Sequence, residues 1–215
     1  MKIVYIPAKD ELFEKCFLPK SCVALLGYGY NAKINLDNEL RGDTNFIRSL
    51  CKLSQSQDIT FLCPSYLLCG NKTFFGTIVV DNGKLLGISD ATHSLCDNVT
   101  PSNAIKVFPT SKGRFGIVSG DDINFFEVSR LLKLWECDCL FFSSLTSPRP
   151  QEKILAKAQG YMNETTSIIF GTKSVFCYNH KKCIKRGNLI CIETKSEKNL
   201  LEKRRKHLYR DIISR

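Results

Sequence analysis

The sequence predicts an α/β protein in which helices cover mixed β-sheets. Near-continuous apolar runs, such as CVALLGY at 22–28, are typical of buried strands. Helix-like segments alternate with these runs, and hairpin-like strand pairs occur among them. These signals fit an α-β-β-α sandwich with mixed sheets, although the periodicity alone does not separate that arrangement from other layered folds.

The first part of the chain alternates strands and helices. Short apolar runs that end at turn residues predict strands, and apolar residues spaced near 3.6 positions predict helices. Leu40, Phe46, Ile47, Leu50 and Leu53 follow the helical spacing. We therefore expect strands at 2–7, 22–28 and 58–64 and helices at 10–18 and 38–56.

A hairpin is expected next. Asn82-Gly83 is a dipeptide suited to a tight turn with positive φ, and it separates apolar runs at 73–81 and 84–89. The hairpin is the clearest sign that the sheets contain antiparallel pairs.

The second part begins with a strand at 114–119 that leads into a helix at about 123–135. Phe125, Val128 and Leu132 form one apolar stripe on that helix, with Trp135 at its end. The remaining predicted elements are strands at 138–144, 166–172, 174–179 and 188–193, a basic turn before the last strand, and helices at 151–163 and 196–215.

Length and composition indicate one globular domain over 1–215. The 215 residues are 43% hydrophobic and 24% charged, which is ordinary for a globular protein. No window approaches the roughly 18 consecutive apolar residues of a membrane-spanning helix. The N-terminal segment lacks the apolar core of a signal peptide. We expect a cytoplasmic protein without a membrane segment.

The eleven cysteines do not indicate a metal site. No CxxC pair occurs, and Cys137 and Cys139 form the only closely spaced pair. The three histidines are far apart in the sequence. We expect reduced, mostly buried thiols, with no metal and no cofactor.

The net charge of +10 is concentrated toward the C-terminal end. Residues 181–215 include KKCIKR and EKRRKHLYR, and a basic segment of this kind can contact phosphates. The same region also fits a solvated amphipathic helix, because its leucines lie near one face. No aromatic-rich binding motif accompanies the charge, so a nucleic-acid partner is not expected.

The stretch GRFGIVSGDDINFFE at 113–127 runs from an apolar strand through a glycine and two aspartates into a helix. Enzymes of the α/β class often carry a nucleophile at such a corner, but this one holds Ser119, Gly120, Asp121 and Asp122. Asp122 is expected to bond backbone amides at the helix start and Glu127 to occupy its first turn. A cation at the two aspartates would need a third nearby acid, and none is present.

This stretch resembles the signature around the catalytic cysteine of the carbon–nitrogen hydrolase, or nitrilase, superfamily. Gly116, Asp122, Phe125 and Glu127 stand in matching places, and Phe126 replaces the usual proline. Further segments agree in order, so the resemblance covers about residues 20–208. It implies the α-β-β-α sandwich, and it implies a dimer in which the helical layers of two subunits pack together in the order α-β-β-α-α-β-β-α.

The resemblance also implies a cysteine nucleophile, a glutamate base and a lysine that stabilises the oxyanion. In this chain the nucleophile position falls on Gly120. The lysine position, two residues before His93, falls on Ala91, and the glutamate position falls on Gly27 or Tyr28. All three roles are vacant. The expected residual pocket consists of Ser119, Gly120, Asp121, Asp122, Glu127 and His93, with an unknown ligand.

Three hypotheses follow. The leading one is a catalytically inactive nitrilase-like protein that serves as a binding or assembly partner, as a homodimer or with an active relative. The second is an active amidohydrolase with a displaced nucleophile, for which Cys63, Cys69 and Cys96 are the candidates. The third is an anionic-surface or nucleic-acid binder that uses residues 181–206, including Lys203, Arg204 and Arg205.

Overall fold

The structure is a computed structural model that describes residues 1–7, 18–29, 33–178, 183–186 and 189–192. The helix predicted at 10–18 falls almost entirely outside the described residues. The basic C-terminal helix predicted at 196–215 lies wholly outside them.

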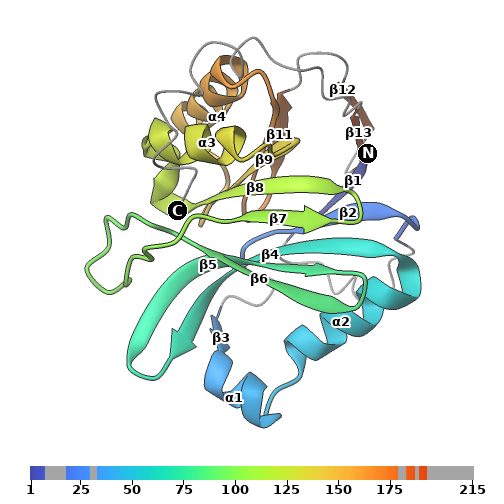
Figure 1. The fold of residues 1–215 in the computed structure, drawn as a ribbon, viewed down its shortest axis with the longest axis vertical. Coiled ribbons are helices and arrows are strands. Elements are labelled where there is room, and N and C mark those ends of the chain that lie inside the picture. Colours follow the sequence, from blue (N-terminus) through green and yellow to red (C-terminus); the bar gives the residue numbers. More distant parts are fainter. Residues whose placement is uncertain (8–17, 30–32, 179–182, 187–188, 193–215) are drawn as a thin grey trace.

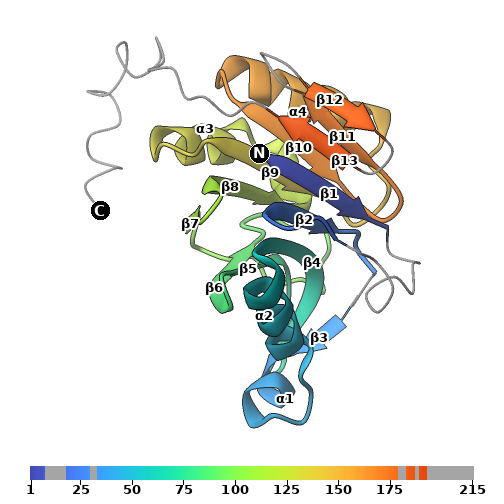
Figure 2. The same ribbon diagram turned by 90° about the vertical axis from the view of Figure 1, so that its right-hand side faces the viewer.

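Two mixed β-sheets lie face to face, and helices cover the outer side of each (Figures 1 and 2). The first sheet runs in the order β12-β13-β1-β2-β4-β5-β6, and β3 pairs with β4. Its parallel pairs are β1–β2, β2–β4 and β3–β4, and the remaining pairs are antiparallel. Its strands are β1 (Lys2–Ile6), β2 (Cys22–Leu26), β3 (Lys33–Asn35), β4 (Ile59–Cys69), β5 (Lys72–Asp81), β6 (Lys84–Asp90), β12 (Cys183–Arg186) and β13 (Leu189–Ile192).

The second sheet runs in the order β11-β10-β9-β8-β7. Its central pairs, β8–β9 and β9–β10, are parallel, and its outer pairs are antiparallel. Its strands are β7 (Val107–Thr110), β8 (Gly113–Ser119), β9 (Cys139–Ser143), β10 (Thr166–Phe170) and β11 (Val175–Tyr178). The prediction of an α-β-β-α sandwich with mixed sheets is therefore confirmed.

The outer layers consist of different helices. Helices α1 (Leu36–Arg41) and α2 (Phe46–Gln57) follow the β3 region and lie against the first sheet (Figure 1). Helices α3 (Phe126–Leu134) and α4 (Pro150–Met162) cover the second sheet. Helices therefore lie on the outer face of both sheets, which is a usual layer arrangement in proteins with helices and sheets.

Three apolar cores hold these layers together. The central core lies between the sheets and includes Leu25, Phe115 and Phe141, all fully buried. A second core joins the first sheet to α2 through Leu50, and a third joins the second sheet to α3 through Leu132. The central strands are apolar on both faces because both faces are covered.

The helix predicted at 38–56 is wrong as a single element. The chain forms α1 and α2 instead, because Gly42 ends α1 with a left-handed φ of 82°. The side chain of Glu39 then caps the start of α2 by accepting hydrogen bonds from Phe46 N and Ile47 N at 3.0 Å. The apolar spacing across 40–53 carried no sign of this break.

Two other predicted elements have different boundaries in the structure, because their strands pair with neighbouring strands. The strand predicted at 58–64 extends to Cys69 because β4 pairs with β5 from Phe61, opposite Val80, to Cys69, opposite Lys72. The predicted basic turn contains strand β12, which pairs with β13. Pairing partners that are distant in sequence supply these hydrogen bonds, so local periodicity misses them.

The corner after β8 also differs from the prediction. The helix expected at 123–135 begins as a 3₁₀ turn over Gly120–Asn124, and the α-helix starts only at Phe126. This turn places Gly120 and the two aspartates directly after β8 of the second sheet. There Gly120 lies next to Phe75 of β5 and Ala91, which follows β6 of the first sheet. No helix of the described residues is long and apolar enough to span a membrane.

Replacement of Phe141 by alanine should lower the free energy of unfolding by about 3–5 kcal/mol, because it leaves a cavity between the two sheets. Denaturant unfolding followed by circular dichroism measures the change. Leu40→Ala is the matched control, since Leu40 is 86% exposed and should change stability by less than about 0.5 kcal/mol. Equal effects of the two substitutions would contradict the layer assignment.

Candidate functional site

Gly120 occupies the corner between β8 and the 3₁₀ turn with a φ of +58°. Residues with a side chain rarely adopt this conformation. A Cβ atom built at this position would lie 2.9 Å from Cδ1 of Phe75, closer than real contacts allow. Both the backbone conformation and the neighbouring ring therefore favour glycine at this corner.

Phe75 belongs to a cluster of three aromatic rings. Its ring centroid lies 5.6 Å from that of Tyr66 and 6.0 Å from that of Tyr28, and the two tyrosine rings lie 5.8 Å apart. All three pairs are close to perpendicular, which is a favourable aromatic geometry. The cluster holds the 3%-exposed ring of Phe75 against Gly120.

The three positions that the resemblance assigns to catalysis converge on this cluster. The Cβ direction of Gly120 leads to Phe75 and, at 3.9 Å, to the Cβ of Ala91. Tyr28, two residues after the end of β2, packs edge-on against the same Phe75 ring. The structure thus brings positions 28, 91 and 120 together around one phenyl ring. None of the three carries a thiol, a carboxylate or an amine.

Asp122 holds the loop after β6 against the corner. Its carboxylate is buried and accepts hydrogen bonds from Thr92 N, Thr92 Oγ1 and His93 N, each at 2.8 Å. The ring Nδ1 of His93 lies 2.8 Å from Asp122 Oδ1, so it carries the proton and donates. The amides that bind Asp122 belong to this loop and not to the helix start, which corrects the prediction.

Asp121 holds the same loop two residues after His93, because its Oδ2 accepts a hydrogen bond from the backbone amide of Leu95 at 2.8 Å. The His93 ring stacks on Phe125, with centroids 3.6 Å apart. The two aspartates and the stack together fix the path of residues 92–95 over the corner.

Ser119 points the opposite way, into the space between the sheets. Its hydroxyl donates to the carbonyl of Ser89 at 2.8 Å and lies 3.2 Å from Thr77 Oγ1 and 3.3 Å from Ser143 Oγ. Its full burial keeps it from any substrate. These hydroxyls link strands of both sheets just beneath the corner.

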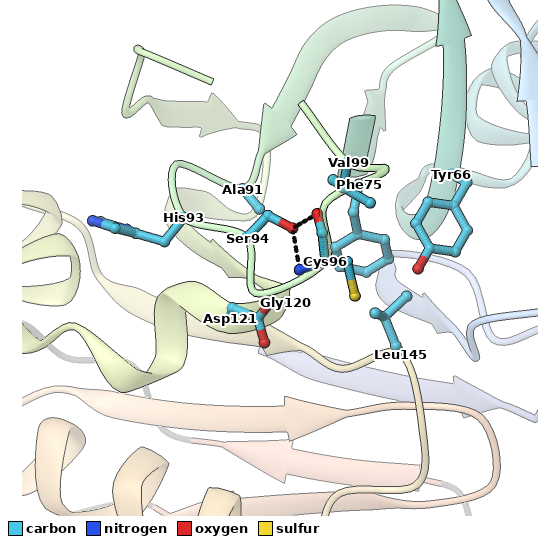
Figure 3. Close-up of a pocket in the computed structure, with 10 residues that line it drawn as sticks. All are labelled: Tyr66, Phe75, Ala91, His93, Ser94, Cys96, Val99, Gly120, Asp121 and Leu145. Carbon is cyan, nitrogen blue, oxygen red and sulfur yellow. Dashed lines mark hydrogen bonds between the residues drawn. The ribbon is translucent and has the colours of Figure 1, made fainter. Parts of the chain in front are cut away.

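A small pocket lies beside Gly120 (Figure 3). Its volume is about 10 Å³, roughly the room that one water molecule needs. Of the predicted pocket residues, Gly120, Asp121 and His93 line it, whereas Ser119, Asp122 and Glu127 do not. Glu127 lies exposed in the first turn of α3. The complete lining is Tyr66, Phe75, Ala91, His93, Ser94, Cys96, Val99, Gly120, Asp121 and Leu145.

Sequence reasoning missed the aromatic wall of this pocket. Tyr66 and Phe75 lie on β4 and β5, in segments that were interpreted only as sheet. Their opposition in the β4–β5 pairing places the two rings side by side. Extending the predicted strand from residue 64 to Cys69 would have placed Tyr66 in the sheet opposite Phe75.

The cysteines differ in their access to the pocket. Burial raises the pKa of Cys63 to about 12, so its thiol is unreactive at neutral pH. Cys69 is exposed at the end of β4 and does not line the pocket, whereas Cys96 does. Within the described residues, no group of three metal-ligating side chains comes together.

Replacement of Asp122 by asparagine should destabilise the protein by about 1–3 kcal/mol, because it removes the charge that four donors share. Hydrogen exchange of the Thr92 and His93 amides should accelerate in this variant. Asp97→Asn is the matched control, since Asp97 is an exposed carboxylate of the same loop. Unchanged exchange at both amides would show that Asp122 does not hold the loop.

Comparison with known proteins bears on the fold alone. No family model and no curated protein sequence matches the chain. Among solved structures, the NitN amidase from Neterenkonia sp. AN1 superposes with a TM-score of 0.68 at 12% identity, covering 99% of each chain. Nit3 of Saccharomyces cerevisiae, a member of branch 10 of the nitrilase superfamily, gives a TM-score of 0.60 at 14% identity, over 80% of this chain and 75% of Nit3.

The carbon–nitrogen hydrolase of Helicobacter pylori G27 gives a TM-score of 0.60 at 12% identity, over 83% of this chain and 80% of that one. These similar structures all belong to carbon–nitrogen hydrolases or the nitrilase superfamily, and they bear out the resemblance seen in the sequence at the level of the fold. The chain has the fold of the nitrilase superfamily of carbon–nitrogen hydrolases.

Proposed function

We propose that this protein is a nitrilase-fold pseudoenzyme, which has lost amide hydrolysis and acts as a binding or assembly partner. The observation that carries the proposal is the contact between Gly120 and Phe75. A side chain at position 120 would overlap the phenyl ring, so the ring stands where a nucleophile would have to project. Position 120 therefore lacks a thiol, and the Phe75 ring fills the space that a side chain at this position would need.

The neighbouring positions support the same conclusion. A thiolate attack on an amide needs a base and an oxyanion donor within hydrogen-bond reach. Ala91 offers only a methyl group there, and Tyr28 offers a phenol whose pKa is raised by burial and then by Tyr66. A phenol that stays protonated is a poor general base.

The purified protein should release no ammonia from a panel of aliphatic and aromatic amides and nitriles. Ammonia release by an active amidase under the same conditions serves as the control. Release by this chain above the level of a heat-denatured sample would contradict the proposal.

One specific observation favours a second candidate function. Of the candidate nucleophiles Cys63, Cys69 and Cys96, only Cys96 lines the pocket. In a hydrolase whose nucleophile lies at another position than in the family, Cys96 would take that role. This candidate requires that any ammonia release disappear in Cys96→Ser and persist in Cys69→Ser, since both thiols are exposed. The third hypothesis rests on residues 181–206, most of which lie outside the described residues.

We also propose that the assembly partner is a second copy of this chain, bound through α4. Ile154, Tyr161 and Met162 are 65%, 64% and 53% exposed, and with Ala158 they form one stripe at helical spacing. The exposed residues of α2, on the opposite layer, are all polar: Arg48, Ser49, Lys52, Gln55 and Ser56. On that layer α1 exposes a single apolar residue, Leu40, so among the described helices a stripe of several exposed apolar residues occurs on α4.

The stripe is suited to a two-fold axis. An antiparallel copy of α4 crossing at Ala158 would place Ile154 of one protomer against Met162 of the other. The small Ala158 at the centre permits close approach of the helices. In a cytoplasmic setting, which we propose as well, the free cysteines of the described residues would stay reduced.

Light scattering after gel filtration should report a dimer, and Ile154→Lys should convert it to a monomer. A charge buried in a helix–helix contact is strongly unfavourable, and dissociation avoids it. Leu40→Lys is the matched control, because Leu40 is also an exposed apolar residue, 86% against 65% for Ile154, but lies on α1 of the other layer. A monomeric wild-type protein would argue against self-association.

A further inference from the structure

The pocket beside Gly120 is acidic although the chain carries a net charge of +10. Asp121 lines it, and no lysine or arginine does. The ring of His93 turns away from the other lining side chains (Figure 3), because its Nδ1 is bound to Asp122. Asp121 Oδ2 accepts the Leu95 amide, and its Oδ1 has no hydrogen-bond partner among the described residues.

Tyr66 adds a second feature that attracts cations. Its ring lines the pocket, and its hydroxyl has no hydrogen-bond partner in the part of the chain that the structure describes. Figure 3 shows Tyr66, Phe75 and Cys96 among the side chains that line the pocket. Aromatic faces attract cations, and a phenol oxygen accepts a hydrogen bond from an ammonium group. The pKa of Tyr66 is raised by burial and, in addition, by the nearby Cys96 and Asp121.

The size of the pocket restricts the cation. A space of about 10 Å³ admits one water-sized group. A primary ammonium head has about that size, whereas a guanidinium or a methylated ammonium is larger. Val99 and Leu145 line the same pocket and offer apolar contact to an alkyl chain that leads out of it.

We propose that this pocket binds the primary ammonium group of an alkylamine. Asp121 supplies the opposite charge, Tyr66 an acceptor oxygen and an aromatic face, and Val99 and Leu145 the contact for the methylene chain. The inference rests on the proposed function, because it names the ligand class of a pocket that we take to serve in binding. The amine is either a free alkylamine or the side chain of a lysine in a partner protein.

Titration of the isotope-labelled full chain with n-butylammonium chloride tests the proposal. Saturable shifts of the Gly120 and Cys96 amide signals are expected. Tetramethylammonium, which is too large, and n-butanol, which is uncharged, should bind at least about tenfold more weakly. Equal binding of n-butanol or of tetramethylammonium, or no saturable shift with n-butylammonium, would overturn the proposal.

Variants locate the site. Asp121→Asn should raise the Kd for n-butylammonium about tenfold or more, whereas Asp97→Asn, an exposed carboxylate of the same loop, should leave it unchanged. Because Asp121 also holds the Leu95 amide, Tyr66→Phe provides a second variant that leaves that bond intact and should weaken binding as well. An unchanged Kd in both pocket variants would overturn the assignment.

Nα-acetyl-lysine methylamide distinguishes the two sources of the amine. Binding at least as tight as that of n-butylammonium identifies a peptide lysine, and binding about tenfold weaker identifies a free alkylamine. The proposed loss of hydrolysis is judged separately, by ammonia release. A chain that releases no ammonia and binds no amine would refute only the present inference.

Discussion

The contact between the backbone of Gly120 and the ring of Phe75 is the constraint on which the site depends. The corner needs a positive φ at residue 120, and the ring leaves no room for a Cβ there. The ring in turn is held by two tyrosines in perpendicular contacts. The backbone of Gly120 and the three rings therefore pack closely against one another at this corner.

The corner can hold this arrangement because both sheets meet beneath it. Ser119 bonds to the Ser89 carbonyl of the first sheet while its own strand lies in the second. Above it, Asp121 and Asp122 hold the loop from β6 over the same turn. Buried carboxylates are retained where several donors satisfy them, and Asp122 meets that condition. The acidic pair therefore shapes the pocket wall, and only one oxygen of Asp121 remains for a ligand.

The two outer layers of the sandwich have different surfaces. Helix α2 presents polar residues to solvent, whereas α4 presents an apolar stripe. The nitrilase-like fold by itself assigns no function, so the binding role proposed above rests on the residues of the corner and of this stripe. The pocket and the α4 stripe involve different residues, so the ligand and the second subunit proposed above would occupy separate sites.

Local pattern determined much of this protein. Apolar runs predicted the buried strands, Asn82-Gly83 predicted the β5–β6 hairpin, and the sequence around Gly120 predicted the fold and the absence of reactive groups at positions 28, 91 and 120. Only the tertiary structure decided what replaced them. Phe75, on β5 of the first sheet, meets Gly120, which follows β8 of the second sheet. Gly42 ends the first of two helices along one apolar stripe, and Cys96 rather than Cys63 or Cys69 lines the pocket. Each of these depends on which distant segments meet, because periodicity records only which face of an element is buried.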